Sequence, residues 1–276
     1  MKPSEEQALI TLLGDEDERV QEMIAKKLLS LGDTCMPLLR RALASADEPA
    51  QRNARRILRQ LCQADADNEF LDFCRSRDQD LERGAFLLAR TGYPEVDMEP
   101  CRATLDAMAE ALRGRLRGTD AAHTVVEKIN RFLFREQKFR GNEADYYDPE
   151  NSYLNRVLDR RLGIPITLST VYLLIAARLH LPIVGVALPG HFLLKYREND
   201  SEFFIDAFNE GLILENKDCR EIVERMNQPF QPSFLAATGP RPMLARMCAN
   251  LIHIYRERKE TAAAGRMEMF LDALTD

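Results

Sequence analysis

The residues best suited to acyl-transfer chemistry lie in the central part of the chain. His191 begins one apolar segment and Asp206 closes the next. A histidine can act as a general base and an aspartate can orient it, so the two would form part of a nucleophile–histidine–acid triad. The third member has to be a nucleophile within reach of the histidine. The helix expected just before this pair carries the hydroxyls of Thr167 and Ser169 and no cysteine.

Apolar stretches separated by turn residues predict an antiparallel sheet that would position the pair. Strands are expected at 183–188, 191–196, 203–207 and 211–214, with a hairpin turn at 197–201. An apolar helix should precede them, from Pro165 to Leu179, because proline is favoured at the first helical position. For the pair to act with a hydroxyl of this helix, His191 would have to lie beside the helix start, with Asp206 within hydrogen-bond reach of its imidazole.

The first sixty residues contain an internal repeat. With a shift of 30 positions, Leu9 aligns with Leu39 and Leu28 aligns with Leu58. Each unit predicts a short helix, an acidic turn and a longer helix, and a weaker third copy begins at Arg77. Helix pairs of this period resemble HEAT-type repeats, which stack to bury their apolar faces. A plain bundle of helical hairpins is the alternative.

The remaining segments are expected to be mainly helical. Loops are predicted where polar and turn-forming residues or prolines gather, at 138–149 and 229–242. Helices are predicted at 99–116, 120–134, 151–161 and 243–274.

Composition favours an ordinary soluble protein. The chain has 276 residues, of which 45% are hydrophobic and 30% charged, and its net charge of −6 argues against nucleic acid as a partner. The sequence shows no apolar run long enough to cross a membrane and no apolar core of a signal peptide near Met1. Six scattered cysteines without a C-x-x-C pair suit free thiols in the cytoplasm. The histidines lack ligand spacing, so neither a metal nor a cofactor is expected.

Four ordered motifs resemble the SirB-type branch of the transglutaminase-like superfamily over residues 80–225. They are Asn-Ser-Tyr-Leu-Asn at 151–155, Arg-x-Gly-x-Pro-Ile-Thr-Leu-Ser at 161–169, Pro-Gly-His-Phe at 189–192 and Phe-Ile-Asp at 204–206. The resemblance implies an α+β fold. It would comprise helical repeats at 1–95, a papain/transglutaminase-like core of helix and antiparallel sheet at 96–225, and a helical, partly tetratricopeptide-like tail at 226–276.

In that superfamily a cysteine nucleophile begins the central helix, and this chain has Pro165 at the equivalent position. His191 and Asp206 take the places of the base and the orienting acid, so the triad would lack its nucleophile. The pair would then be either a structural hydrogen bond or a remnant of acid–base chemistry. Ser169, one helical turn deeper, is a possible substitute nucleophile, and a packed serine is the alternative.

Other motif positions are candidates for ligand binding or for architecture. The motif positions are Asn151, Asn155 and Arg161, and Tyr172 in the following helix is a further candidate. As architectural residues, Asn151 would cap the following helix, and Arg161 would reach Glu150 or Asp206.

The missing cysteine favours a non-catalytic, cytoplasmic protein that binds another protein or a peptide, with neither nucleic acid nor membrane as its partner. The alternative is an amide hydrolase or acyl transferase that uses Ser169 or Thr167 with His191 and Asp206. A third possibility is a scaffold whose old site is filled by side chains.

Overall fold

The structure is a computed structural model, and it describes residues 3–77, 80–198 and 201–276. The chain forms two compact units, one of Met1–Phe70 with Arg90–Val96 and one of Leu71–Ala89 with Asp97–Asp276. Parts of two sequence predictions, the turn at 197–201 and the start of the third repeat copy, lie outside the described residues.

The first unit is built from helices, with acidic turns before the second and the fourth and a 3₁₀ helix (Gly32–Cys35) between the second and the third. The helices are α1 (Pro3–Leu13), α2 (Glu18–Leu31), α3 (Met36–Leu43) and the first part of α4 (Glu48–Arg75). Asp17 accepts a hydrogen bond from the backbone N–H of Arg19 and so caps α2, and Asp47 accepts one from Ala50 at the start of α4. The helix–turn–helix pattern agrees with the sequence, whereas its assignment to HEAT-type repeats stays a prediction.

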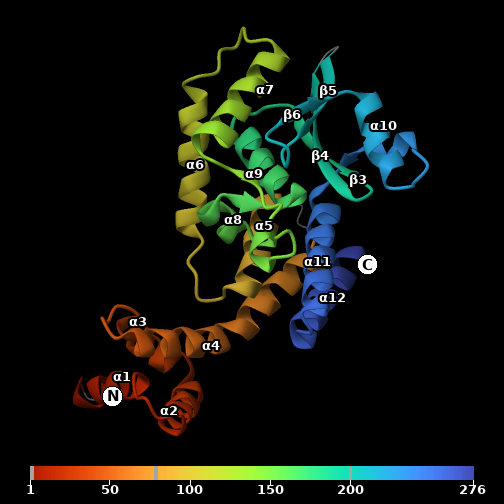
Figure 1. Cartoon of the computed structure of the whole chain (residues 1–276). Helices are drawn as coiled ribbons and strands as arrows, with labels where there is room; N and C mark the ends of the chain where they lie inside the picture. The colour runs from red at the N-terminus through yellow and green to blue at the C-terminus, as the bar shows by residue number, and fades with distance from the viewer. Residues whose placement is uncertain (1–2, 78–79, 199–200) are drawn as a thin grey trace. The chain divides into compact units, whose positions relative to one another are not determined.

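The second unit combines helices with a five-stranded antiparallel sheet, so the predicted α+β class is confirmed (Figure 1). The strand order is β6-β5-β4-β3-β7. The strands are β3 (Ile183–Leu188), β4 (His191–Glu198), β5 (Ser201–Asp206), β6 (Leu212–Leu214) and β7 (Ala237–Thr238). The helices before the sheet are α5 (Leu81–Gly92), α6 (Glu99–Arg113), α7 (Ala122–Asn130) with a π-helical extension (Arg131–Glu136), α8 (Leu154–Arg160) and α9 (Pro165–Arg178).

Helix α9 is the central element of this unit. It packs against β3 and β4 on one side and against α6 on another (Figure 1). Nearly every residue of α9 is buried, which explains why its sequence is apolar all round rather than amphipathic. Its first turn is fixed by Pro165 and by the hydroxyl of Thr167, which accepts a hydrogen bond from the backbone N–H of Ile164 at 3.1 Å.

Several boundaries differ from the sequence predictions. The helix expected at 151–161 begins only at Leu154, after a 3₁₀ turn (Pro149–Ser152). The side chain of Asn151 does not cap this helix, because it donates hydrogen bonds to the carbonyls of Asp145 and Tyr146 in the preceding loop. The loop expected at 138–149 also contains the two-residue strand β1 (Arg140–Gly141), which pairs in parallel with β2 (Leu162–Gly163).

The C-terminal segment is a helical hairpin rather than one helix. Helices α11 (Pro240–Glu257) and α12 (Thr261–Thr275) are separated by a tight turn in which Lys259 has a φ of 60°. The guanidinium of Arg241 holds this hairpin in the second unit, because it donates hydrogen bonds to carbonyls at the C-terminal ends of α4 and α12. The acceptors are the carbonyl oxygens of Cys74, Ser76, Ala273 and Leu274. These bonds satisfy carbonyls that have no partner within their own helices.

Candidate functional site

A tight turn places His191 at the edge of the sheet. Strands β3 and β4 are joined by Pro189 and Gly190, and Leu188 pairs directly with His191. Gly190 has a φ of +70°, a conformation that glycine adopts without strain, and proline suits the first central position of such a turn. The Pro-Gly pair therefore fixes the point at which the imidazole leaves the sheet.

His191 and Asp206 meet across neighbouring strands. Nε2 of His191 lies 2.8 Å from Oδ2 of Asp206, and the aspartate side chain is almost completely buried. Asp206 also accepts hydrogen bonds from the backbone N–H groups of Phe208 and Asn209 and from the side-chain amide of Asn209. We refer to His191 and Asp206 as the dyad.

The carboxylate of Asp206 is held in its ionised form. Burial by itself would raise the pKa of Asp206, but the hydrogen bonds from His191 and Asn209 outweigh it and hold that pKa below its ordinary value. An ionised carboxylate only accepts hydrogen bonds, so the proton of neutral His191 resides on Nε2. Nδ1 of the neutral imidazole then carries no proton, and a triad requires one such nitrogen on its histidine.

The three positions considered for the nucleophile, Pro165, Ser169 and Thr167, offer no accessible nucleophilic group. Pro165, at the position where the resemblance predicts one, is buried at the start of α9 and has no group that attacks an acyl carbon. Ser169 is fully buried, and within the described part of the chain its hydroxyl has no hydrogen-bond partner. The hydroxyl of Thr167 is engaged, since it donates to the carbonyl of Asn151 at 2.7 Å. Neither hydroxyl is presented to a substrate.

Two polar residues of the first motif are packed inside the unit. Asn151 is fully buried, and its carbonyl and side chain tie the loop before α8 to the first turn of α9. Asn155 is also buried, and its Oδ1 has no hydrogen-bond partner among the described residues. These positions suit an architectural role, and their role in binding stays a prediction.

The other two candidates are packed as well. Arg161 ends α8 in a left-handed conformation, with its guanidinium 4.6 Å from the ring centroid of Phe139. The expected ion pair with Glu150 or Asp206 is wrong, because Glu150 pairs with Arg156 and Arg160 and Asp206 pairs with His191. Tyr172 is fully buried and donates a hydrogen bond to Asn130, and burial raises its pKa.

A cavity of about 430 Å³ opens beside the dyad. We call it the dyad cavity. Its apolar wall combines Leu212 and Leu214 with Ile222 and Met226. Its polar lining comprises His191, Asp206, Asn209, Asp218, Glu221 and Arg225. Helix α10 (Asn216–Arg225) supplies residues to both the apolar and the polar lining. This helix was not predicted from the sequence, although its apolar residues recur at helical spacing.

An aromatic ring also contacts the histidine of the dyad. Phe208 lies edge-on to His191, with ring centroids 6.4 Å apart, and it contacts Tyr146 in the same manner. Gly141 in β1 makes room for this ring, because a Cβ atom there would lie 2.6 Å from Phe208. Phe208 therefore lies close to both the histidine and strand β1.

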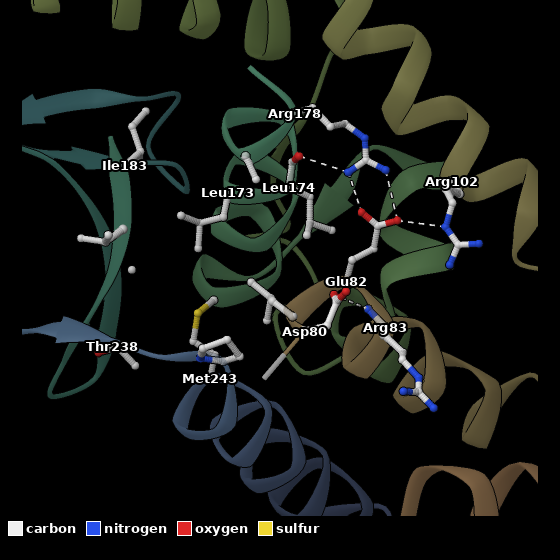
Figure 2. A pocket seen from close by; sticks show the side chains of 15 residues that line it. Asp80, Glu82, Arg83, Arg102, Leu173, Leu174, Arg178, Ile183, Thr238 and Met243 are labelled. Atoms are coloured by element: carbon white, nitrogen blue, oxygen red, sulfur yellow. Dashed lines mark hydrogen bonds and ion pairs between the residues drawn. The ribbon is translucent and has the colours of Figure 1, made fainter. Parts of the chain in front are cut away.

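A second cavity, of about 620 Å³, lies between β3, α9 and the N-terminal ends of α5 and α11. Figure 2 shows Glu82 on its rim between Arg178 and Arg102. Burial would raise the pKa of Glu82, but the hydrogen bonds from these arginines outweigh it and lower that pKa. Glu82, Arg178 and Arg102 therefore form ion pairs with one another. Because the described lining also contains no histidine or cysteine, this cavity lacks the groups for acyl chemistry.

Within the described residues, no group of three or more histidine, cysteine, aspartate or glutamate side chains is arranged to hold a metal ion. None of the described helices combines the length and apolar character needed to span a membrane.

Comparison with known proteins identifies the family to which the second unit is similar. The Transglutaminase-like superfamily profile matches residues 99–249, more than half of the chain. A UPF0162 protein of Xylella fastidiosa is 34% identical over 188 residues, which cover 66% of this chain and 67% of that protein. A UPF0162 protein of Pseudomonas aeruginosa is 34% identical over 47% of this chain and 48% of its own length.

Human F-box only protein 21 is 29% identical over 58% of this chain, but the match covers only 30% of that longer protein. No solved structure matches the chain. The matched region contains all four motifs, the dyad and helix α9. The chain therefore belongs to the transglutaminase-like superfamily.

Proposed function

We propose that this chain is a non-catalytic transglutaminase-like protein that binds a segment of another protein in the dyad cavity. The observation that supports the proposal is Pro165, which the resemblance places at the nucleophile position, whereas His191 and Asp206 occupy the positions of the base and its orienting acid and bond to each other. Removing the nucleophile of a triad removes the covalent route and leaves only what binding and polar groups supply. The four motifs also support a place in the SirB-type branch of the superfamily.

The dyad cavity has the properties of a binding site. Its volume falls within the range of about 300–1,000 Å³ typical of ligand pockets. Leu212 and Met226, which line it, are 54% and 53% exposed, although large apolar side chains usually avoid water. Exposed apolar groups beside convergent polar groups favour contact with another molecule. The hydrogen bond between His191 and Asp206 would then fix the orientation of two polar side chains that line the cavity.

The alternative is an acyl-transfer enzyme that uses Ser169 with His191. One observation favours it: the buried hydroxyl of Ser169 has no hydrogen-bond partner in the described part of the chain, and such groups call for an explanation. Its complete burial opposes this role, because a substrate carbonyl would have to enter the helix packing. An ordered water that satisfies the hydroxyl is the simpler account.

Site-specific photocrosslinking in the native cell tests the proposal. A benzophenone amino acid placed at Leu212 should crosslink to one recurrent protein segment, identified by mass spectrometry. The matched control is the same amino acid at Met269, another partly exposed apolar residue, which does not line the cavity. Crosslinks to the same segment from both positions, or none from Leu212, would contradict binding in the dyad cavity.

A further inference from the structure

We infer that the dyad cavity accepts an arginine side chain of the bound segment. The inference rests on the proposed function and adds the chemistry of the ligand. Its basis is the arrangement of hydrogen-bond acceptors around the cavity, which follows from the bonds that Asp206 makes.

The hydrogen bonds of Asp206 determine which atoms of Asn209 and His191 remain able to accept a hydrogen bond from a ligand. Because its carboxylate only accepts, the atom of Asn209 that lies 2.8 Å from it must be the amide nitrogen. Oδ1 of Asn209 is then an acceptor, and no donor is bonded to it among the described residues. By the same reasoning Nδ1 of neutral His191 is an acceptor, and it too has no partner in the described part of the chain.

Carboxylates of α10 add further acceptors on the opposite wall. Asp218 accepts a hydrogen bond from the backbone N–H of Glu215 through one oxygen, and Glu221 makes a 3.3 Å ion pair with Arg225. That pair is largely exposed and therefore weak. Arg225 is the sole cationic residue of the described lining unless His191 is protonated. A ligand for this cavity has to supply donors and positive charge.

Arginine fits these requirements better than lysine. Its planar guanidinium carries five N–H donors in a fixed fork, and it is more weakly hydrated than an ammonium group. The acceptors lie on separate elements, β4, the loop after β5 and α10, so several donors pointing in different directions can be used at once. The apolar side chains of Leu212, Ile222 and Met226 offer contacts for the methylene groups of the ligand and for the faces of the guanidinium.

A titration of the full chain followed by NMR tests the inference. The probes are N-acetyl-arginine methylamide, its lysine and citrulline counterparts, and N-acetyl-glutamate methylamide. The arginine probe should cause saturable shifts of the amide signals of Gly190, Asn209 and Ile222. It should bind several-fold more tightly than the lysine probe, and the neutral citrulline and the anionic glutamate probes should not bind.

Asp218→Asn is the informative variant, because asparagine removes the charge and can still cap α10 through its side-chain oxygen. The loss of one charge-assisted contact should weaken the arginine probe about tenfold. Glu224→Gln, on the same helix but outside the cavity lining, should leave the affinity unchanged. Equal binding of arginine and citrulline, preferential binding of lysine or glutamate, or no saturable shift would overturn the inference.

The two proposals fail in different ways. If crosslinking from Leu212 identifies a segment but the arginine probe does not bind, the ligand chemistry is wrong and the proposed function stands. If the arginine probe binds but Leu212 gives no specific crosslink, the cavity binds guanidinium groups and the proposed binding of a protein segment is contradicted.

Discussion

Replacing Asp206 by asparagine tests the arrangement of the dyad, because it changes the charge while retaining the shape of the side chain. The amide oxygen of asparagine can still accept from the backbone N–H groups of Phe208 and Asn209, which contact Oδ1 in the native chain. The amide nitrogen replaces Oδ2 and would face two donors, Nε2 of His191 and the amide nitrogen of Asn209.

The magnitude follows from these contacts. Two hydrogen bonds to a charged oxygen are lost, each contributing about 1.5–3 kcal/mol. His191 can regain one neutral bond, about 1 kcal/mol, if its proton moves to Nδ1 and Nε2 accepts from the new amide. We therefore expect Asp206→Asn to lower the free energy of unfolding by about 2–5 kcal/mol near pH 7.

The pH dependence gives an independent check. The folded-state pKa of Asp206 lies below its ordinary value, so the stability it contributes is complete above the unfolded pKa of about 3.9. That contribution is lost as the pH falls through the folded pKa. The difference in stability between the native chain and Asp206→Asn should therefore shrink as the pH is lowered from about 5 toward 3.

Urea unfolding followed by tyrosine fluorescence measures this stability. The chain has no tryptophan, and all its tyrosines except Tyr93 lie in the second unit. Nitrogen NMR of His191 should show the Nε2–H tautomer in the native chain and the Nδ1–H tautomer in the variant. The reasoning is refuted if Asp206→Asn matches the exposed control Asp272→Asn in stability and the tautomer does not change.

Three further predictions concern the surrounding structure. Arg241→Gln should lower the free energy of unfolding by about 2–4 kcal/mol, because carbonyls at two helix ends lose their donor; an unchanged urea midpoint would contradict this. Burial raises the pKa of Cys74 and of Cys219 to about 12. After brief exposure of the folded chain to iodoacetamide at pH 8, mass spectrometry should therefore find both thiols unmodified. Prompt alkylation would show that they are not buried. Glu82→Gln should reduce stability by about 1–3 kcal/mol, whereas Glu110→Gln, which disturbs only an exposed ion pair, should have little effect; equal effects would argue against the buried role of Glu82.

The elements that carry the dyad could be predicted from the sequence because their signals are local. Apolar runs bounded by turn residues marked β3, β4 and β5. Pro165 and the apolar run after it marked α9. Asp206 closes the strand next to the one that His191 opens, so the antiparallel hairpin brings them together.

Other features depend on contacts between distant segments and gave no local signal. The parallel pair of β1 and β2 involves two residues from each strand, too few to show periodicity. The break between α11 and α12 lies at Arg258–Glu260, where neither glycine nor proline interrupts the helical pattern. The bonding of Asn151 to a preceding loop also depended on tertiary structure, since the same residue type is a common helix cap.

Our proposal that the chain lacks a working nucleophile is tested most directly with a fluorophosphonate probe, which modifies activated serine and threonine hydroxyls. The purified chain is treated with the probe and its intact mass is recorded. Because Pro165 cannot react and Ser169 and Thr167 are buried, we expect the mass to remain unchanged. A single adduct that maps to Ser169 or Thr167 and disappears in His191→Ala would show that a triad operates, and would contradict the account of a non-catalytic protein.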